Sequence, residues 1–223
     1  MDVTVSEKLD REKEKKSLAL HWVAQFFSYC FHPIFIPLYA TWFLVFIHPS
    51  LFVGYSTAGK IWILVRVGYT MVFFPLVTVM LLRALGFISS FYLETQRDRI
   101  IPYIASGIFF FWAYLVFRNQ PEIPGVLTAF AFGVFLSSSA ALLANIYCKI
   151  SMHAMGVGGL TGLLLLLSLE DSMLMTMPLA AAVLITGVVC TSRLLVSNHK
   201  TVEIYLGLLV GFCCQLLAYL LYA

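Results

Sequence analysis

The sequence predicts an all-α fold, a polytopic transmembrane helical bundle of six or seven spanning helices. Hydrophobic residues make up 61% of the chain and charged residues only 11%, with a mean hydropathy of +0.93. These values lie far outside the range of soluble domains. Apolar stretches also recur along the chain, and the longer ones approach the roughly 20 residues that cross a bilayer. Both observations indicate a membrane protein.

Seven stretches are candidates for membrane spans, and they cover residues 21–47, 61–82, 100–117, 124–148, 154–169, 173–193 and 203–222. The first is long and is interrupted at His32 and Pro33 and again at Pro37. It fits either an interfacial helix followed by one span or a single kinked span. The fifth is short, which favours a tilted or partly re-entrant helix.

Residues 1–17 form a charged tail of mixed sign, for which we expect a solvated or interfacial helix. The apolar stretch behind the tail is too long and aromatic for a cleavable signal peptide. Residues 18–223 are then a single transmembrane domain. A formal charge of +3 is too small to predict a nucleic-acid partner. All five cysteines lie in or beside apolar stretches without ligand-like spacing, which favours buried free thiols: Cys30, Cys148, Cys190, Cys213 and Cys214.

Polar residues gather in three clusters: residues 94–102, residues 149–153 and residues 192–203. Two crossings separate each cluster from the next, so all three should emerge on the same side of the membrane. The connections near 48–60, 118–123 and 170–172 should face the other side. Charged groups at membrane depth are costly unless they are paired or face a polar cavity, so this asymmetry predicts a functional site.

The third cluster carries the sharpest pattern. Ser192 and Arg193 are followed by five residues, His199, three residues and Glu203. His199 and Glu203 are four residues apart, so on a helix the carboxylate reaches the imidazole. A turn at residues 197–198 would bring Arg193 to the same place. Arginines with hydroxyl and amide donors suit a phosphate, and a histidine beside a carboxylate is a good nucleophile.

The three clusters resemble the motifs of the type 2 phosphatidic acid phosphatase superfamily of integral membrane lipid phosphatases: K-x6-R-P, P-S-G-H and S-R-x5-H-x3-D. The third motif matches except that Glu203 replaces aspartate. The second keeps Ser151 and His153 but has lost the proline and the glycine, and Met152 stands in the glycine position. The first is loose, with Arg99 and Pro102 not adjacent and no lysine seven residues before Arg99.

The resemblance implies a divergent lipid phosphatase that works without metal or other cofactor, through a phosphohistidine. It makes His199 the nucleophile, Glu203 its orienting partner and His153 the general acid. It implies phosphate-binding roles for a further set of residues: Arg193, Ser151, Arg99, Arg97, Lys149 and Ser192. The substrate would be a lipid phosphate or pyrophosphate, such as polyprenyl pyrophosphate, phosphatidate, phosphatidylglycerol phosphate or a lipid A phosphate. We expect an integral protein of a bacterial inner (plasma) membrane, of unknown oligomeric state.

Two alternatives stay open at this point. A catalytically degenerate relative would bind or transport a phospholipid with the same residues, and a metal-dependent hydrolase would use His153, His199 and Glu203 as ligands. The side of the membrane is open too. The basic tail predicts a cytoplasmic N-terminus, and seven crossings would then place the site in the cytoplasm. A first stretch that is interfacial, or that makes two passes, would place it outside.

Other polar or small residues have ordinary structural interpretations. His21, His32 and His48 fit interfacial positions, and Ser137, Ser138 and Ser139 fit small polar packing inside a span. The glycines at 156, 158, 159 and 162 favour close helix packing over a phosphate cradle.

Overall fold

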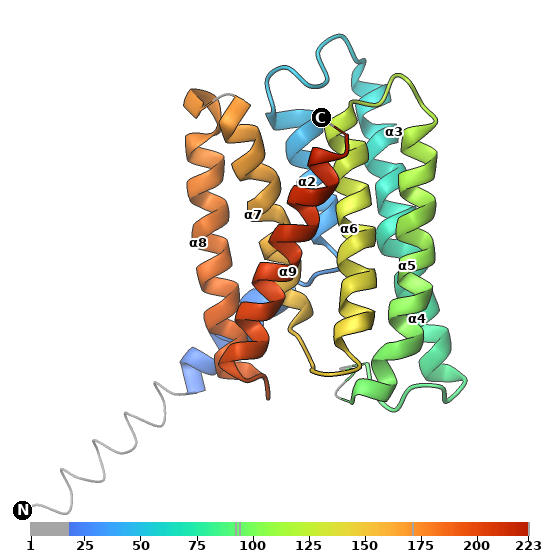
Figure 1. The fold of residues 1–223 in the computed structure, drawn as a ribbon, viewed down its shortest axis with the longest axis vertical. Helices are drawn as coiled ribbons and strands as arrows, with labels where there is room; N and C mark the ends of the chain where they lie inside the picture. Colours follow the sequence, from blue (N-terminus) through green and yellow to red (C-terminus); the bar gives the residue numbers. More distant parts are fainter. Residues whose placement is uncertain (1–17, 92, 94, 171, 223) are drawn as a thin grey trace, which may run out of the picture.

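The protein is a bundle of long helices in a computed structural model that describes residues 18–91, 93, 95–170 and 172–222 (Figure 1). The expected tail helix, residues 1–17, lies outside the described residues. Six helical stretches in this part of the chain are long and apolar enough to cross a membrane. The first is continuous over Thr57–Ala84 and consists of α3 (Thr57–Val67), the short π-helix η2 (Gly68–Phe73) and α4 (Phe74–Ala84). The other five are α5 (Gln96–Arg118), α6 (Gly125–Ala144), α7 (Met152–Glu170), α8 (Ser172–Val196) and α9 (Thr201–Leu220). The predicted all-α transmembrane bundle is confirmed.

The first apolar stretch is broken. Residues 18–30 are helical, and the chain turns at residues 31–35. Helix α2 (Ile36–Trp42) then continues into the short π-helix η1 (Phe43–Ile47). Pro33 lies in this turn and cannot donate the backbone hydrogen bond of a continuing helix. The predicted second interruption at Pro37 is wrong, because Pro37 lies in the first turn of α2, where its missing N–H costs nothing. The stretch begins at one end of the bundle and reaches the connection at the other end (Figure 1).

The connections that carry the three polar clusters all lie at one end of the bundle, the lower end in Figure 1. Backbone and side-chain hydrogen bonds tie them together there. Gln96 and Asn145 exchange side-chain to backbone bonds of 2.8 Å each, and the Ser151 N–H donates to the Glu203 carbonyl at 3.0 Å. The prediction that the clusters share one side is confirmed.

The first cluster is mostly helical rather than a loop that Pro102 ends. The Thr95 hydroxyl accepts the Asp98 N–H at 3.1 Å and caps α5 at Gln96, so Pro102 lies inside the helix. A threonine cap of this kind satisfies one of the unpaired N–H groups of a first turn. The helix therefore starts four residues before the predicted residue 100, and it carries Arg97 and Arg99 on its first turns.

Helix α7 is a full helix of 19 residues and the most buried of the six spans, so the prediction of a partly re-entrant fifth segment is wrong. Glycines explain how closely it packs on α9. A Cβ atom on Gly158 would collide with the Leu208 carbonyl, and one on Gly211 would collide with the Met155 carbonyl. The glycines of this segment therefore permit close packing, as predicted.

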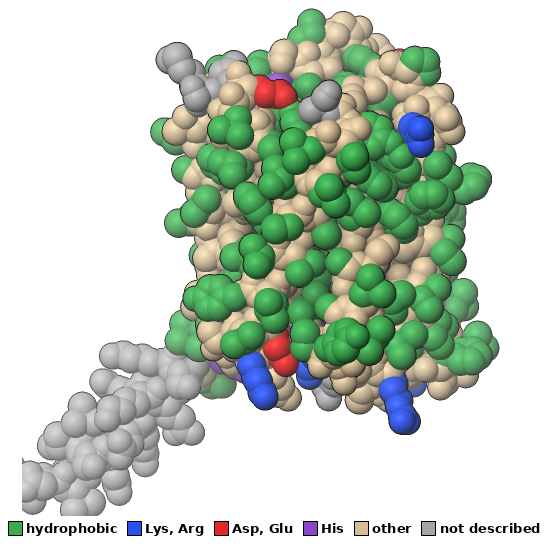
Figure 2. All heavy atoms as spheres, in the orientation of Figure 1, with side chains coloured by type: hydrophobic (Ala, Val, Ile, Leu, Met, Phe, Trp, Pro, Cys, Tyr) green, Lys and Arg blue, Asp and Glu red, His purple; other side chains and the backbone are tan. Residues whose placement is uncertain are grey.

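Large apolar side chains cover the flanks of the bundle, and charged side chains gather at its two ends (Figure 2). In water such a surface would be an aggregation hazard, whereas a lipid environment solvates it. The chain is an integral membrane protein with its polar clusters at one membrane face.

Candidate functional site

A cavity of about 720 Å³ opens among the helices at the end where the three clusters meet. The N-terminal segment, α4, α5, α6, α7, α8 and α9 all contribute to its lining. Four of the predicted site residues line it, one or two from each cluster: Arg99, His153, Arg193 and His199. Residues separated by a hundred positions in the sequence thus face one space.

His199 and Glu203 form a hydrogen-bonded pair. The His199 Nδ1 lies 2.8 Å from the Glu203 Oε2, and both side chains are largely buried, with 6% and 16% of their surface exposed. Glu203 also accepts the Lys200 N–H at 3.2 Å, as the third residue of α9, so its carboxylate is held in place by the helix start. A carboxylate on Nδ1 keeps that nitrogen protonated and leaves the Nε2 lone pair for chemistry.

Burial lowers the pKa of His199 below its ordinary value, and the hydrogen bond that His199 donates to Glu203 opposes that shift. Arg99 and Arg193 lower the pKa further, because they add positive charge nearby. Near neutral pH the ring is therefore in the neutral form that a nucleophile requires.

Arg193 is partly buried and lacks the partners that its position calls for. Its Nε is buried without a hydrogen-bond partner, and within the described part of the chain no carboxylate lies at ion-pair distance from it. Leaving a buried charged donor unpaired costs more than an ordinary hydrogen bond contributes. Since Arg193 lines the cavity, its positive charge is available to an anion there.

Arg99 is held as a fixed donor. It is only 4% exposed, its Nε donates to the Leu93 carbonyl at 2.8 Å, and its Nη1 donates to the Ile150 carbonyl at 3.1 Å. Leu93 has a left-handed backbone with φ of 48°, a conformation that is costly for a residue with a side chain. The two carbonyls, which come from two different connections between helices, orient the guanidinium and leave its charge uncompensated.

His153, on the first turn of α7, binds the N-terminal segment. Its Nε2 lies 3.2 Å from the Ser28 carbonyl. A carbonyl only accepts, so Nε2 carries a proton and Nδ1 is the atom left for exchange with a substrate.

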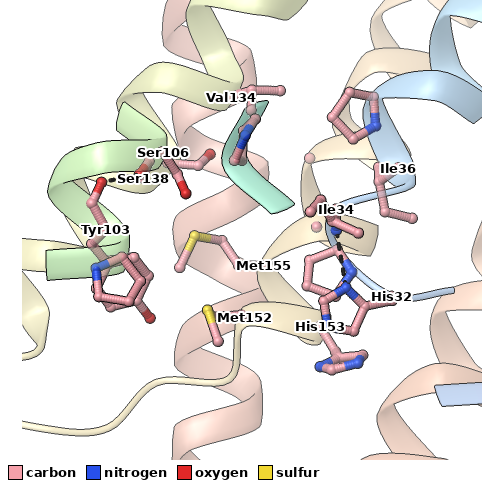
Figure 3. A pocket seen from close by; sticks show the side chains of 18 of the residues that line it. His32, Ile34, Ile36, Tyr103, Ser106, Val134, Ser138, Met152, His153 and Met155 are labelled. Atoms are coloured by element: carbon pink, nitrogen blue, oxygen red, sulfur yellow. Dashed lines mark hydrogen bonds between the residues drawn. The ribbon is translucent and has the colours of Figure 1, made fainter. Parts of the chain in front are cut away.

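His32 completes the group, although the sequence analysis predicted an interfacial position for it. It lines the same cavity, and its ring stands at 83° to the ring of His153 with the centroids 5.0 Å apart (Figure 3). Burial lowers its pKa to about 4, and the positive charge of Arg193 adds to that shift. Its place in the broken part of the first stretch, beside Pro33, was the only signal in the sequence.

Ser151 and Ser192 are buried but do not line the cavity. The Ser151 hydroxyl accepts the Ala154 N–H at 3.4 Å and its own N–H binds the Glu203 carbonyl, so the residue fixes the start of α7 against α9. Their predicted contacts with phosphate are untested, and neither hydroxyl faces the cavity in this arrangement. Met152, in the position of the motif glycine, does line it.

Arg97 and Lys149 also lie outside this cavity. Arg97 is exposed on the first turn of α5, and Lys149 lines a separate hollow together with Lys200 and Glu203. Among the described residues no group of three or more histidine, cysteine, aspartate or glutamate side chains is arranged to hold a metal ion.

The remainder of the cavity lining is largely apolar, with Leu76, Val79, Phe110, Phe130 and Leu160 among its residues. The interpretation of the serines in α6 as packing residues needs a correction. Ser137 and Ser138 line the cavity, and the Ser138 hydroxyl donates to the Tyr103 carbonyl at 3.3 Å (Figure 3). Helical periodicity alone did not separate the cavity face of α6 from its packed faces.

The chain matches no family model, no curated protein and no solved structure in the comparisons. Its function is therefore argued from the residues in and around the cavity.

Proposed function

We propose that the protein is a membrane phosphohydrolase that cleaves a lipid phosphate or pyrophosphate through a phosphohistidine intermediate. The observation that carries the proposal is the cavity itself. It combines a partly buried Arg193 whose Nε has no hydrogen-bond partner, a fixed Arg99 and a histidine whose Nδ1 is bound to Glu203. Two uncompensated guanidinium groups favour a doubly charged phosphoryl group, which arginine binds better than any other side chain does.

In the first step the His199 Nε2 attacks phosphorus. The P–N bond forms as the bond between phosphorus and the leaving oxygen breaks, and that oxygen takes a proton from the Nδ1 of protonated His153. Arg99 and Arg193 stabilise the charge on the equatorial oxygens. Glu203 stabilises the positive charge that the His199 ring gains.

In the second step water attacks phosphorus and the P–N bond breaks. His153, now neutral, takes the proton of the water, so inorganic phosphate leaves and both histidines return to their starting states. A single histidine thus acts as acid and then as base.

An amphiphilic substrate fits the position of the cavity. The charged residues lie at the membrane face, and the apolar lining extends from them between the helices. A lipid tail could occupy the apolar part while the headgroup phosphate meets the arginines. This supports a lipid substrate over a soluble phosphate ester, without choosing among lipids.

The test is phosphate release by the detergent-purified full chain from a panel of lipid phosphates, in EDTA, with His199→Ala as the inactive variant. We expect release by the wild type, inhibition by orthovanadate and less than about a thousandth of the rate in the variant. His48→Ala, at the opposite end of the bundle, is the matched histidine control.

The alternative is a relative that has lost catalysis and binds or transports a phospholipid, a reading favoured by Met152 in the cavity lining. Lipid binding that is equal in the wild type and His199→Ala, with no phosphate release in either, would favour that alternative. Loss of wild-type activity in EDTA, with recovery on adding a divalent metal, would contradict metal-free chemistry.

A further inference from the structure

The segment before the first full span contributes to the cavity at its charged end. His32 lines the space shared by Arg193, His153 and His199, although 121 or more positions separate it from each of them in the sequence. Its side chain lies against His153 in Figure 3, with the two rings nearly perpendicular. None of the three motif clusters includes this residue.

The N-terminal segment is firmly seated at this point. A Cβ atom on Gly156 of α7 would lie 3.3 Å from the Ile36 side chain and 3.4 Å from Pro33. The Ser28 carbonyl, one helical turn before His32, binds His153. Contacts on both sides of His32 therefore fix its backbone relative to the first turns of α7.

The hydrogen bonding of His32 determines which ring nitrogen can donate. The Ile34 backbone N–H donates to the His32 Nδ1 at 3.3 Å (Figure 3). An N–H group cannot accept, so Nδ1 carries a lone pair and the proton of the neutral ring is on Nε2. The low pKa of His32, about 4, agrees with a neutral ring near pH 7. The residue is thus a neutral donor in a cavity that holds two cationic arginines.

We propose that His32 is a further substrate-binding residue of this site, whose Nε2–H donates to an oxygen of the phosphoryl group held by Arg99 and Arg193. The inference rests on the proposed function, since it takes the same phosphoryl group as ligand. A neutral donor adds a hydrogen bond without adding a further positive charge beside Arg193. Its main effect falls on the transition state, where charge on the phosphoryl oxygens is greatest.

Two substitutions of similar size separate donation from packing. In His32→Gln the amide nitrogen takes a place close to that of Nε2 and can still donate. In His32→Phe the ring still packs on His153 but donates nothing. His21→Ala is the control, because His21 is an exposed residue of the same helical segment.

The experiment titrates orthovanadate, a mimic of the phosphoryl transition state, into the purified full chain by calorimetry and measures the hydrolysis rate in parallel. We expect His32→Phe to weaken vanadate binding by about 10- to 1000-fold and to lower kcat by a similar factor. We expect His32→Gln to remain within about tenfold of the wild type, and His21→Ala to match it. If a thermal unfolding curve shows that His32→Phe is not folded, His32→Met replaces it as the apolar variant.

The outcomes separate this inference from the proposed function. A wild type that neither binds vanadate nor releases phosphate would overturn the proposed function and this inference together. A wild type that binds vanadate, with His32→Phe or His32→Met binding equally well, would overturn the role of His32 alone. A folded His32→Gln variant as weak as the apolar variant would also overturn it, because donation would not be what the site requires.

Discussion

The backbone N–H of Ser151 donates to the backbone carbonyl of Glu203 across 3.0 Å. This bond joins the first residues of α7 and α9, so the helix that carries His153 and the helix start that holds His199 are fixed to each other. It depends on the close approach of the two helices, since Gly207 faces the Ser151 backbone directly. The geometry of the site is therefore coupled to glycine packing farther along α9.

Gly211 tests that coupling. Its Cβ would overlap the Met155 carbonyl, so Gly211→Ala should push α9 away from α7, with a destabilisation of about 1–3 kcal/mol and a loss of activity. Gly187→Ala is the matched control, because nothing lies within 4 Å of a Cβ on Gly187 of α8. Thermal unfolding and phosphate release check both variants. Equal stability of the two variants would contradict the packing argument.

Glu203→Gln separates the charge of this residue from its shape. The amide oxygen can still accept the Lys200 N–H and the His199 Nδ1–H, so we expect nearly unchanged stability. The positive charge on His199 loses its partner, and kcat should fall by roughly 100- to 10,000-fold. The control is Glu122→Gln, an exposed residue of the connection at the opposite end. Full activity in Glu203→Gln would show that orientation alone suffices.

Arg193→Met should have opposite effects on the empty and the anion-bound protein. Removing a partly buried guanidinium whose Nε is buried and unpaired should stabilise the ligand-free protein by about 1 kcal/mol. The same change should abolish the thermal stabilisation that vanadate gives the wild type. Arg118→Met is the comparison, because Arg118 donates to the Tyr114 hydroxyl at 3.2 Å and has no such penalty to relieve. An Arg193→Met variant less stable than the wild type without ligand would contradict the anion-site interpretation.

The pH dependence of kcat/KM should show a histidine that titrates below its ordinary value. Burial and the charges of Arg99 and Arg193 lower the pKa of His199, whereas Glu203 raises it. The neutral His199 ring is the nucleophile, so the acid limb of the profile should follow the lowered pKa of His199, below the ordinary histidine value. The base limb belongs to His153, which must be protonated to act as the acid. In Glu203→Gln the negative charge that raises the pKa of His199 is gone, and the acid limb of the residual activity should move to still lower pH. An acid limb above pH 7 would contradict this assignment.

The structure also bears on which face of the membrane carries the site. Residues 18–30 lie at the end that holds the site, and the last turns of α9 lie at the other end (Figure 1). The preceding basic residues, Lys8, Arg11, Lys13, Lys15 and Lys16, predict that the first of these ends is cytoplasmic. In a bacterial host, alkaline phosphatase fused after residue 222 should then be active and a fluorescent protein fused there dark. The reverse result would place the site outside the cytoplasm.

Sequence reasoning predicted the parts of this protein that depend on local pattern. The lengths of the apolar stretches gave the spans to within a few residues, because the bilayer fixes how long an apolar helix must be. The even number of crossings between clusters placed Arg99, His153 and Arg193 at one end. The predicted hydrogen bond between His199 and Glu203 is present, but the predicted shared helical face is wrong, because His199 lies two residues before α9 begins at Thr201. The carboxylate reaches the ring from the first turn of α9.

Tertiary structure decided which polar side chains face the cavity. His32 joins His153 by a contact between residues 121 positions apart in the sequence, while Ser151 is taken up by the junction of α7 and α9, and Arg97 points out on the exposed side of α5. Periodicity describes one helix at a time. From the sequence one cannot tell which helix packs against the break at Pro33 or against the serines of α6. Those choices follow from how glycine-rich faces let particular helices approach, and only the assembled bundle contains that information.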